Sequence, residues 1–182
     1  RAGTEHPITA ELRALGVDVA IERVDVAAPD QLEKLLKKIR ANRPPLRAVF
    51  HAAGVVHDSV LGKESWNSYC EATAPKIQGA WNLHRLTESD PIRLMVFFSS
   101  VASILGSPGQ GSYAAGNAFL DALAHHRASR GLATLSVNWG AWASAGMAAR
   151  LAPEQAARWA RQGAKAVEPA NALDALASAI ES

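Results

Sequence analysis

The sequence has little of what marks secreted, membrane-bound or metal-binding proteins. It contains one cysteine, Cys70, so an intramolecular disulfide and a multi-cysteine metal site are both excluded. It has no run near the roughly 18 consecutive apolar residues that a membrane span needs. We therefore expect a reducing, cytoplasmic setting, no metal centre and no membrane partner.

The chain also lacks a strong excess of charge of either sign. Lys and Arg total 19 against 17 Asp and Glu, a formal net charge of +2, and no basic cluster stands out. This balance gives no reason to expect a nucleic-acid partner. Hydrophobic residues make up 48% of the 182 residues, which is typical of a soluble globular protein. We expect residues 1–182 to form a single domain.

One motif is missing that a dinucleotide-binding protein usually has. The Gly-x-Gly-x-x-Gly turn, which holds a pyrophosphate at the start of a helix, is absent. The segment 106–111 is rich in glycine, but it follows a later predicted strand. The chain begins at Arg1 with neither a methionine nor a signal-type apolar stretch. We therefore expect it to be a piece of a longer protein.

The elements that the sequence does contain indicate an α/β fold. Short apolar or β-branched runs predict strands, and amphipathic or Ala-rich stretches predict helices between them. The predicted strands are 17–26, 46–50, 92–98 and 134–139, and the predicted helices are 11–15, 30–39, 63–86, 112–129 and much of 148–182. Strands that alternate with helices predict a parallel, doubly wound, Rossmann-like sheet.

Local signals refine this pattern. Gly16 closes the first helix, Asp30 caps the second, and Pro75 predicts a kink or a break into two helices within 63–86. The short apolar run 46–50 is typical of a strand that is buried on both faces of a parallel sheet.

Ligands of such sheets bind at the carboxyl ends of the strands. Three small or polar segments follow predicted strands: the turn 51–54, the serines at 99 and 100, and the pair 139–140. We expect the chemistry of the protein at this edge.

Four residues near this edge form a plausible set for reducing a carbonyl. Tyr113 and Asn117 lie four residues apart at the start of a predicted helix, so they share one face. Ser100 ends the preceding strand, and the glycine-rich loop can fold it back toward Tyr113. A tyrosine hydroxyl can protonate the developing alkoxide while a serine hydroxyl holds the carbonyl oxygen. Taken singly, each of these residues also has an ordinary role as a turn, packing, capping or solvated residue.

The tyrosine needs help to act as an acid. Its ordinary pKa is about 10, so a nearby cation is required near neutral pH. Lys76, on an earlier predicted helix, is the candidate cation. Asn117 can hold an ordered water that relays protons from solvent.

Longer strings in the sequence carry a resemblance to a known family. Phe-Phe-Ser-Ser-Val-Ala-Ser at 97–103 and the stretch 106–124 resemble the active-site segment of ketoreductase domains from modular type I polyketide synthases. These domains are a branch of the short-chain dehydrogenase/reductase superfamily. Three further blocks resemble the same family in the same order: 51–55, 75–84 and 138–142. In the wider superfamily a lysine usually stands four residues after the tyrosine. Asn117 stands there in this chain, and the exchange with Lys76 is characteristic of the synthase-embedded branch.

The resemblance implies an activity. It implies that NADPH reduces a β-ketoacyl thioester to a β-hydroxyacyl thioester, on the phosphopantetheine arm of an acyl carrier protein within the same multidomain synthase. Tyr113 would be the proton donor, and Ser100 would supply the second hydrogen bond to the carbonyl. Lys76 would make the tyrosine a better acid and bind the nicotinamide ribose. Asn117 would support the proton relay.

The resemblance also implies where the cofactor lies. Asp25 and Val26 resemble a pair whose acid contacts adenine, although a turn at the end of a strand explains them equally well. The small residues at 52–54 suit a cofactor path because they allow close approach to the backbone. The expected cofactor-binding residues are Asp25, Val26, Ala52, Ala53, Gly54, Lys76 and Tyr113.

Residues at the substrate entrance sort these ketoreductases by the configuration of their product. Asp58 keeps the last residue of the Leu-Asp-Asp string of B-type domains, although it could instead cap the following helix. Leu105 stands where the other type has a tryptophan, eight residues before Tyr113. Pro108 agrees with the B-type, whereas Ser112 replaces an asparagine that is common there. We expect a B-type enzyme that makes the D-configured (3R) hydroxyl. The expected entrance residues are Asp58, Leu105, Pro108, Gln110 and Met147, with a lid over about 143–165.

Two other classes of function remain open at this stage. One is a structural reductase-like subdomain, which should not retain all four catalytic positions. The other is a free-standing reductase of small carbonyl compounds, against which Asn117 and the string at 139–142 argue.

The expected truncation leads to a first prediction. A chain without the first βαβ unit of the fold lacks the pyrophosphate site at its glycine-rich turn. We predict that residues 1–182 alone bind NADPH poorly and turn over little β-ketoacyl thioester. A fluorescence titration with NADPH and an absorbance assay of its oxidation check this, and measurable NADPH-dependent reduction by residues 1–182 alone would contradict it.

Overall fold

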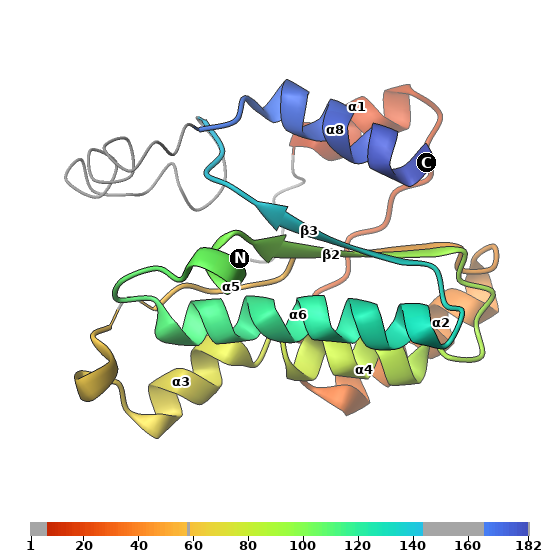
Figure 1. Cartoon of the computed structure of the whole chain (residues 1–182). Coiled ribbons are helices and arrows are strands. Elements are labelled where there is room, and N and C mark those ends of the chain that lie inside the picture. Colours follow the sequence, from red (N-terminus) through yellow and green to blue (C-terminus); the bar gives the residue numbers. More distant parts are fainter. Residues whose placement is uncertain (1–6, 58, 144–165, 182) are drawn as a thin grey trace.

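A parallel sheet of three strands forms the centre of the computed structural model, which describes residues 7–57, 59–143 and 166–181 (Figure 1). The strands are β1 (Ala48–His51), β2 (Leu94–Ser100) and β3 (Thr134–Trp139), in the order β1-β2-β3. β1 pairs with β2 from Ala48↔Leu94 to His51↔Phe97, and β2 pairs with β3 from Met95↔Thr134 to Ser100↔Trp139. This register brings the carboxyl ends of the three strands to one edge.

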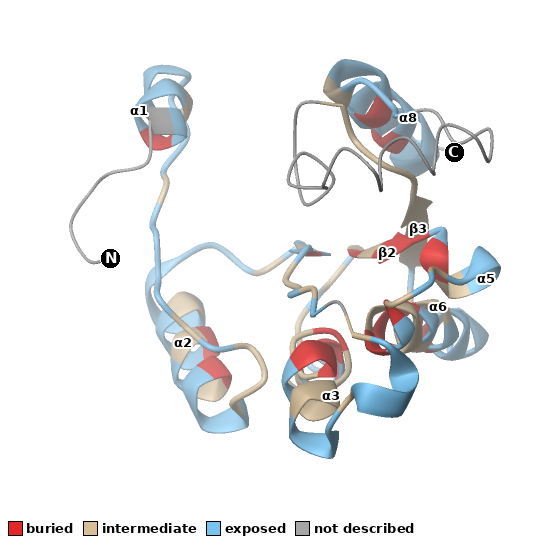
Figure 2. Ribbon diagram, turned by 90° about the vertical axis from the view of Figure 1, so that its left-hand side faces the viewer, coloured by how far each residue is buried: buried red, intermediate tan, exposed pale blue. Residues whose placement is uncertain are grey.

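Helices lie on both sides of this sheet, as the doubly wound arrangement predicts (Figures 1 and 2). On one side lie α2 (Pro29–Asn42), α3 (Trp66–Thr73), α4 (Gln78–Leu86) and α6 (Gly111–Ser129). On the other side lie α1 (Pro7–Ala14) and α8 (Pro169–Glu181). Two short helices, η1 (Leu61–Lys63) and α5 (Ala102–Leu105), lie in the connections that follow β1 and β2.

The main core lies between the sheet and the helices on the α6 side. Alternation along β2 directs Met95 and Phe97 into it, and both are fully buried. The remaining buried members come from α2, α4 and α6: Leu32, Leu36, Ala80, Leu83, Leu120, Leu123 and Ala124. Their burial fixes α6, whose first turns carry the candidate catalytic residues, against β2. None of the helices in the described ranges is both long and apolar enough to span a membrane.

Several predicted elements are confirmed. The strand predicted at 134–139 has the bounds of β3, and the helix predicted over 63–86 consists of α3 and α4 with Pro75 between them. Proline has no backbone N–H and clashes with the preceding turn, which accounts for the break. Gly16 and Gly131, which follow α1 and α6, have φ angles of 79° and 73°, a conformation that favours glycine.

One predicted strand is absent, and the burial predicted for another is wrong. Residues 17–26 form no strand, and Ile21 is 64% exposed. β1 is an edge strand, so its Phe50 is 53% exposed rather than buried on both faces. A run of β-branched residues indicates a preference for extended backbone. A strand also needs a neighbouring strand to pair with its backbone N–H and C=O groups. Within the described ranges, β2 is the sole strand that pairs with β1.

The predicted cap of α2 is also wrong. The helix begins one residue earlier than expected, at Pro29, and Ala28 occupies the cap position without a side-chain hydrogen bond. Proline suits the first helical position because its φ is already helical and its missing N–H would have no partner there. Asp30 lies in the first turn instead, where its charge favours the helix dipole. The helical residues predicted between 148 and 165 lie outside the described residues.

Candidate active site at the carboxyl edge of the sheet

Lys76 lies in the link between α3 and α4 and is directed into the protein. It is 3% exposed, and its Nζ donates a hydrogen bond to the carbonyl oxygen of Phe98 in β2 at 2.9 Å. The same Nζ lies 5.8 Å from the centroid of the Tyr113 ring. The amine therefore reaches the tyrosine of α6 from a different part of the chain, by way of β2.

Burial determines the charge state of this amine. It lowers the pKa of Lys76 to about 8, because removing an ammonium group from water penalises its charged form. The carboxylate of Asp121 acts in the opposite direction and favours the charged form. At neutral pH the amine is therefore mostly protonated beside Tyr113.

His51, at the end of β1, holds the backbone next to this lysine. Its Nε2 lies 3.0 Å from the carbonyl oxygen of Pro75, and its ring meets Phe97 edge-on at 6.2 Å between centroids. Burial and the charge of Lys76 lower the pKa of His51 to about 4. The imidazole is therefore neutral near pH 7, with Nε2–H donating to Pro75. Sequence reasoning treated His51 only as part of a turn and missed this contact.

Two glycines leave room for the lysine side chain. A Cβ placed on Gly54 would lie 3.1 Å from Cε of Lys76, and one on Gly116 would lie 3.4 Å from its Cβ and Cδ. The sequence analysis predicted Gly54 only as a residue that the cofactor passes. In the structure it also borders the passage that Lys76 follows toward Tyr113.

Asn117 lies one turn after Tyr113 on α6 and is fully buried. Its Nδ2 donates to the backbone carbonyl of Tyr113 at 2.8 Å, whereas its Oδ1 is buried without a hydrogen-bond partner. Buried acceptors in folded proteins are nearly always satisfied, so this oxygen is suited to a donor such as an ordered water. It lies on the same helix face as the tyrosine.

The end of β2 is tied to the same turn of α6. Ser99 Oγ donates to the backbone carbonyl of Asn117 at 3.2 Å. Ser100 is the last residue of β2, is largely buried, and accepts a hydrogen bond on Oγ from the backbone N–H of Ala102 at 3.2 Å. The structure thus gathers the catalytic tetrad predicted from the sequence (Lys76, Ser100, Tyr113 and Asn117) where β2 meets α6.

The predicted adenine contact at Asp25 and Val26 lies in a turn just before α2. Asp25 Oδ1 accepts a hydrogen bond from the backbone N–H of Ala27 at 2.9 Å, which is the turn role that the sequence left open. Asn82 of α4 donates to the carbonyls of Val26 and Ala27, each at 3.1 Å. The turn is therefore fixed against α4, while its contact with a nucleotide stays a prediction.

The entrance residues are only partly described. The backbone N–H of Ser59 donates to the carbonyl of Gly109 at 2.8 Å, and Ser59 forms an isolated bridge with Gln110. The segment after Asp58 and the loop before α6, which includes Pro108, are therefore joined at the backbone. Leu105 is 81% exposed at the end of α5. Asp58, Met147 and nearly all of the lid at 143–165 lie outside the described residues.

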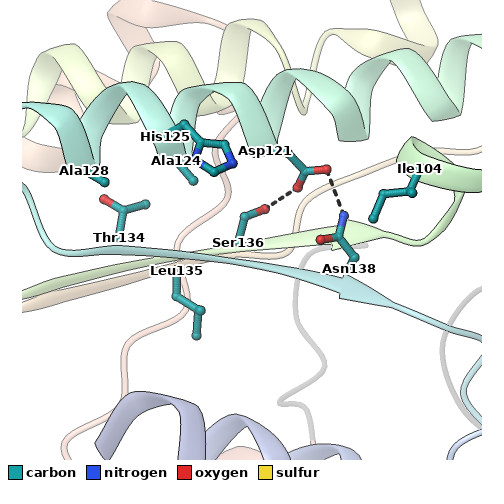
Figure 3. Close-up of a pocket in the computed structure, with 9 residues that line it drawn as sticks. All are labelled: Ile104, Asp121, Ala124, His125, Ala128, Thr134, Leu135, Ser136 and Asn138. Atoms are coloured by element: carbon teal, nitrogen blue, oxygen red, sulfur yellow. Dashed lines mark hydrogen bonds between the residues drawn. The ribbon is translucent and has the colours of Figure 1, made fainter. Parts of the chain in front are cut away.

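The described residues also contain a pocket that the tetrad does not line. No cluster of three or more His, Cys, Asp or Glu side chains suited to a metal ion is found in the described ranges. A pocket of about 340 Å³ lies between α6 and β3 (Figure 3), and no residue of the tetrad is among those that line it. Its polar lining includes Asp121, Ser136 and Asn138.

Comparison with known proteins identifies the family of this chain. The family model of the KR domain matches residues 2–144. The chain is 41% identical over 177 residues to a phenolphthiocerol synthesis polyketide synthase type I from Mycobacterium marinum, a match that covers 97% of this chain and 8% of that synthase. It is 48% identical over 141 residues to a chalcone synthase from Aspergillus candidus, covering 76% of this chain and 5% of that protein.

Solved structures agree with this. An A-type ketoreductase from a modular polyketide synthase is 45% identical with a TM-score of 0.83, over 94% of this chain and 36% of that chain. A ketoreductase from the first module of phoslactomycin biosynthesis in Streptomyces is 35% identical with a TM-score of 0.84, over 93% of this chain and 39% of that chain.

The parallel α/β fold and the residues at its carboxyl edge define a Rossmann-like oxidoreductase. The chain belongs to the ketoreductase domain family of modular polyketide synthases, a branch of the short-chain dehydrogenase/reductase superfamily.

The depressed pKa of Lys76 predicts an effect on stability. A lysine whose pKa is lower in the folded than in the unfolded state destabilises the fold at every pH where the unfolded lysine is charged. This cost is complete below pH 8, the folded value, and disappears as the pH rises past 10.5, the ordinary value. We predict that Lys76→Met raises the free energy of unfolding at pH 7 by about 1–3 kcal/mol.

Urea unfolding of the two proteins between pH 7 and pH 11 measures this difference. It should shrink above pH 8, whereas Lys34→Met, at an exposed position of α2, should leave the free energy of unfolding within about 0.5 kcal/mol at each pH. A loss of stability for Lys76→Met at pH 7 would contradict the prediction.

Proposed function

We propose that this chain is the catalytic part of an NADPH-dependent β-ketoacyl reductase that makes a β-hydroxyacyl thioester during polyketide chain elongation. The observation that carries the proposal is the buried amine of Lys76, which lies 5.8 Å from the Tyr113 ring centroid and comes from a different part of the chain. A protonated amine next to a phenol favours the charge that the phenol develops when it gives up its proton.

We propose for each residue of the tetrad the role that the resemblance to the family implies. Tyr113 donates its hydroxyl proton to the oxygen of the reduced carbonyl, and Ser100 donates a second hydrogen bond to that oxygen. Lys76 stabilises the tyrosinate that remains. The unpartnered Oδ1 of Asn117 accepts a hydrogen bond from a water, which returns a proton to the site.

The described residues fit a nicotinamide cofactor at this edge. Ala52, Ala53 and Gly54 carry little or no side chain where the chain leaves β1, so a ligand can approach their backbone closely. The Lys76 ammonium is suited to the ribose hydroxyls, together with Tyr113. Asp25 and Val26 would contact the adenine end. The cofactor supplies the hydride, and we propose that it is NADPH.

We propose a B-type stereochemical outcome, the D-configured (3R) alcohol. Asp58, the leucine at 105 in place of a tryptophan, and Pro108 support it. Two similar solved structures, at 43% and 45% identity, are described as A1-type and A-type ketoreductases. Identity over the whole domain reflects the shared fold, whereas configuration depends on the few residues at the entrance. Chiral analysis of the product decides between the two types.

The proposed substrate and partners are based on the multidomain synthases to which this chain is related. Because the alignment covers only 8% of the Mycobacterium marinum synthase, most of that protein consists of other parts. We propose that this chain likewise works among other domains of a synthase in the cytoplasm. Its substrate would be a β-ketoacyl chain on the phosphopantetheine arm of an acyl carrier protein.

Removing the phenol hydroxyl tests the mechanism. Tyr113→Phe, in the full-length protein, should lower kcat for a β-ketoacyl thioester by about 10²- to 10⁴-fold, because the general acid is lost. NADPH oxidation measured by absorbance, with chiral chromatography of the alcohol, gives both the rate and the configuration.

The chain offers a matched control. Tyr69 of α3 is its other tyrosine and stacks on Trp66, so Tyr69→Phe should keep kcat within about threefold. Equal kcat values for Tyr113→Phe and the unmodified protein would contradict the assignment of the acid. An L-configured product would overturn the B-type proposal and leave the reductase proposal intact.

A further inference from the structure

Asp121 is a carboxylate on α6, close to the tetrad, that has no role in the mechanism proposed above. Asp121 follows Tyr113 and Asn117 on α6 at successive intervals of four residues, so the three share one face of the helix. No Lys or Arg of the described ranges forms an ion pair with it. Instead, neutral donors from α5 and β3 surround its two oxygens.

The donors come from two elements. Oδ1 accepts from Ser136 Oγ at 2.6 Å, while Oδ2 accepts from Asn138 Nδ2 at 2.8 Å and from Ser103 Oγ at 2.6 Å. Figure 3 shows the bonds from Ser136 and Asn138, which reach up from β3 to Asp121 on α6. Burial acts to raise the pKa of Asp121, but these hydrogen bonds together lower it below its ordinary value, so the carboxylate is charged at neutral pH.

Two of the three donors also contact the end of β2. Ser103 Oγ lies 2.9 Å from the carbonyl oxygen of Ser100, so its single proton is shared between that oxygen and Asp121. Asn138 Nδ2 lies 3.4 Å from the same carbonyl and 3.3 Å from Ser99 Oγ. Ser136 has no such contact among its hydrogen bonds.

The network therefore ends on the backbone of two tetrad members. Through Ser103 and Asn138 it reaches the carbonyl of Ser100, and through Ser99 it reaches the carbonyl of Asn117. Asp121 is the point where α5, α6 and β3 are joined, since each of them contributes a polar side chain to it or carries it.

We propose that Asp121 is a positioning residue of the ketoreductase site, which fixes Ser100 and Asn117 relative to Tyr113 through Ser103 and Asn138. This inference rests on the function proposed above and extends it to a side chain that contacts neither substrate nor cofactor. Small displacements of groups that hold the reacting atoms are costly, of the order of 10²-fold in rate for about 1 Å.

The charge of Asp121 has a second consequence for the site. The titratable groups that face Lys76 in the described ranges are His51 of β1 and Tyr113 and Asp121 of α6. His51, with a pKa of about 4, stays neutral through neutral and alkaline pH. Asp121 is the group that favours the charged form of Lys76, so removing its charge lowers the pKa of Lys76.

Two variants of the full-length protein separate positioning from simple support of the fold. Ser103→Ala and Ser136→Ala each remove one hydroxyl that lies 2.6 Å from the same carboxylate, so both should lose stability. Ser103→Ala should lose somewhat more, because Ser103 Oγ also accepts a hydrogen bond from Asn138 Nδ2 at 2.9 Å. Only Ser103 also contacts Ser100. Ser103→Ala should therefore lower kcat for a β-ketoacyl thioester by about 10-fold, and Ser136→Ala by less than threefold.

Asp121→Asn adds a readout that loss of stability does not move. Its kcat should fall by about 10- to 100-fold, and the alkaline limb of its kcat/KM profile should move to lower pH. Asp90→Asn is the control: Asp90 pairs with Arg40, at the opposite end of β2 from Ser100. It should leave kcat and the pH profile unchanged while it costs stability.

Equal kcat values for the two serine variants would overturn the positioning role. So would an Asp121→Asn protein that is folded and keeps both its kcat within threefold and its alkaline limb. If the unmodified protein itself reduces no β-ketoacyl thioester, the proposed function fails first, and this inference fails with it.

Discussion

The proposed active site depends on one buried cation. The amine of Lys76 has left water and is held by a single carbonyl of β2, Phe98, with the Tyr113 ring beyond it. Burying an ammonium group costs stability, and the same burial lowers the pKa of Lys76 to about 8. Enzymes commonly accept such a cost where it prepares a charge for a reaction. Here the cost gives a phenol a cationic neighbour without a lysine on the phenol's own helix.

Several neighbouring features can be understood as conditions for this burial. Gly54 and Gly116 leave space along the lysine side chain, and His51 holds the carbonyl of the residue before it. Because His51 is itself uncharged near neutral pH, it adds no repulsion. The parallel register of the sheet brings the ends of β1 and β2 together, so that residues far apart in the chain meet around one side chain.

Sequence reasoning predicted the regular elements well where the signal was local. The strand predicted at 134–139 has the bounds of β3, and Pro75 separates α3 from α4. It failed at residues 17–26 and at Phe50, because pairing and burial depend on a neighbouring strand that no local pattern reports. The tetrad was predicted from the resemblance to a family rather than from spacing alone. The roles of His51 and Asp121 could not be predicted, since their partners at 75, 103, 136 and 138 become neighbours only in the fold.

The titration of Lys76 is the most direct test of this account. Nuclear magnetic resonance of protein carrying lysine labelled with ¹³C at Cε, with Lys76→Arg to assign the signal, measures it in the folded protein. The account predicts a midpoint near pH 8, well below the ordinary lysine value of 10.5. A midpoint at the ordinary value of 10.5 would mean that the amine is solvated, and the cation that the mechanism requires would not be where the structure places it.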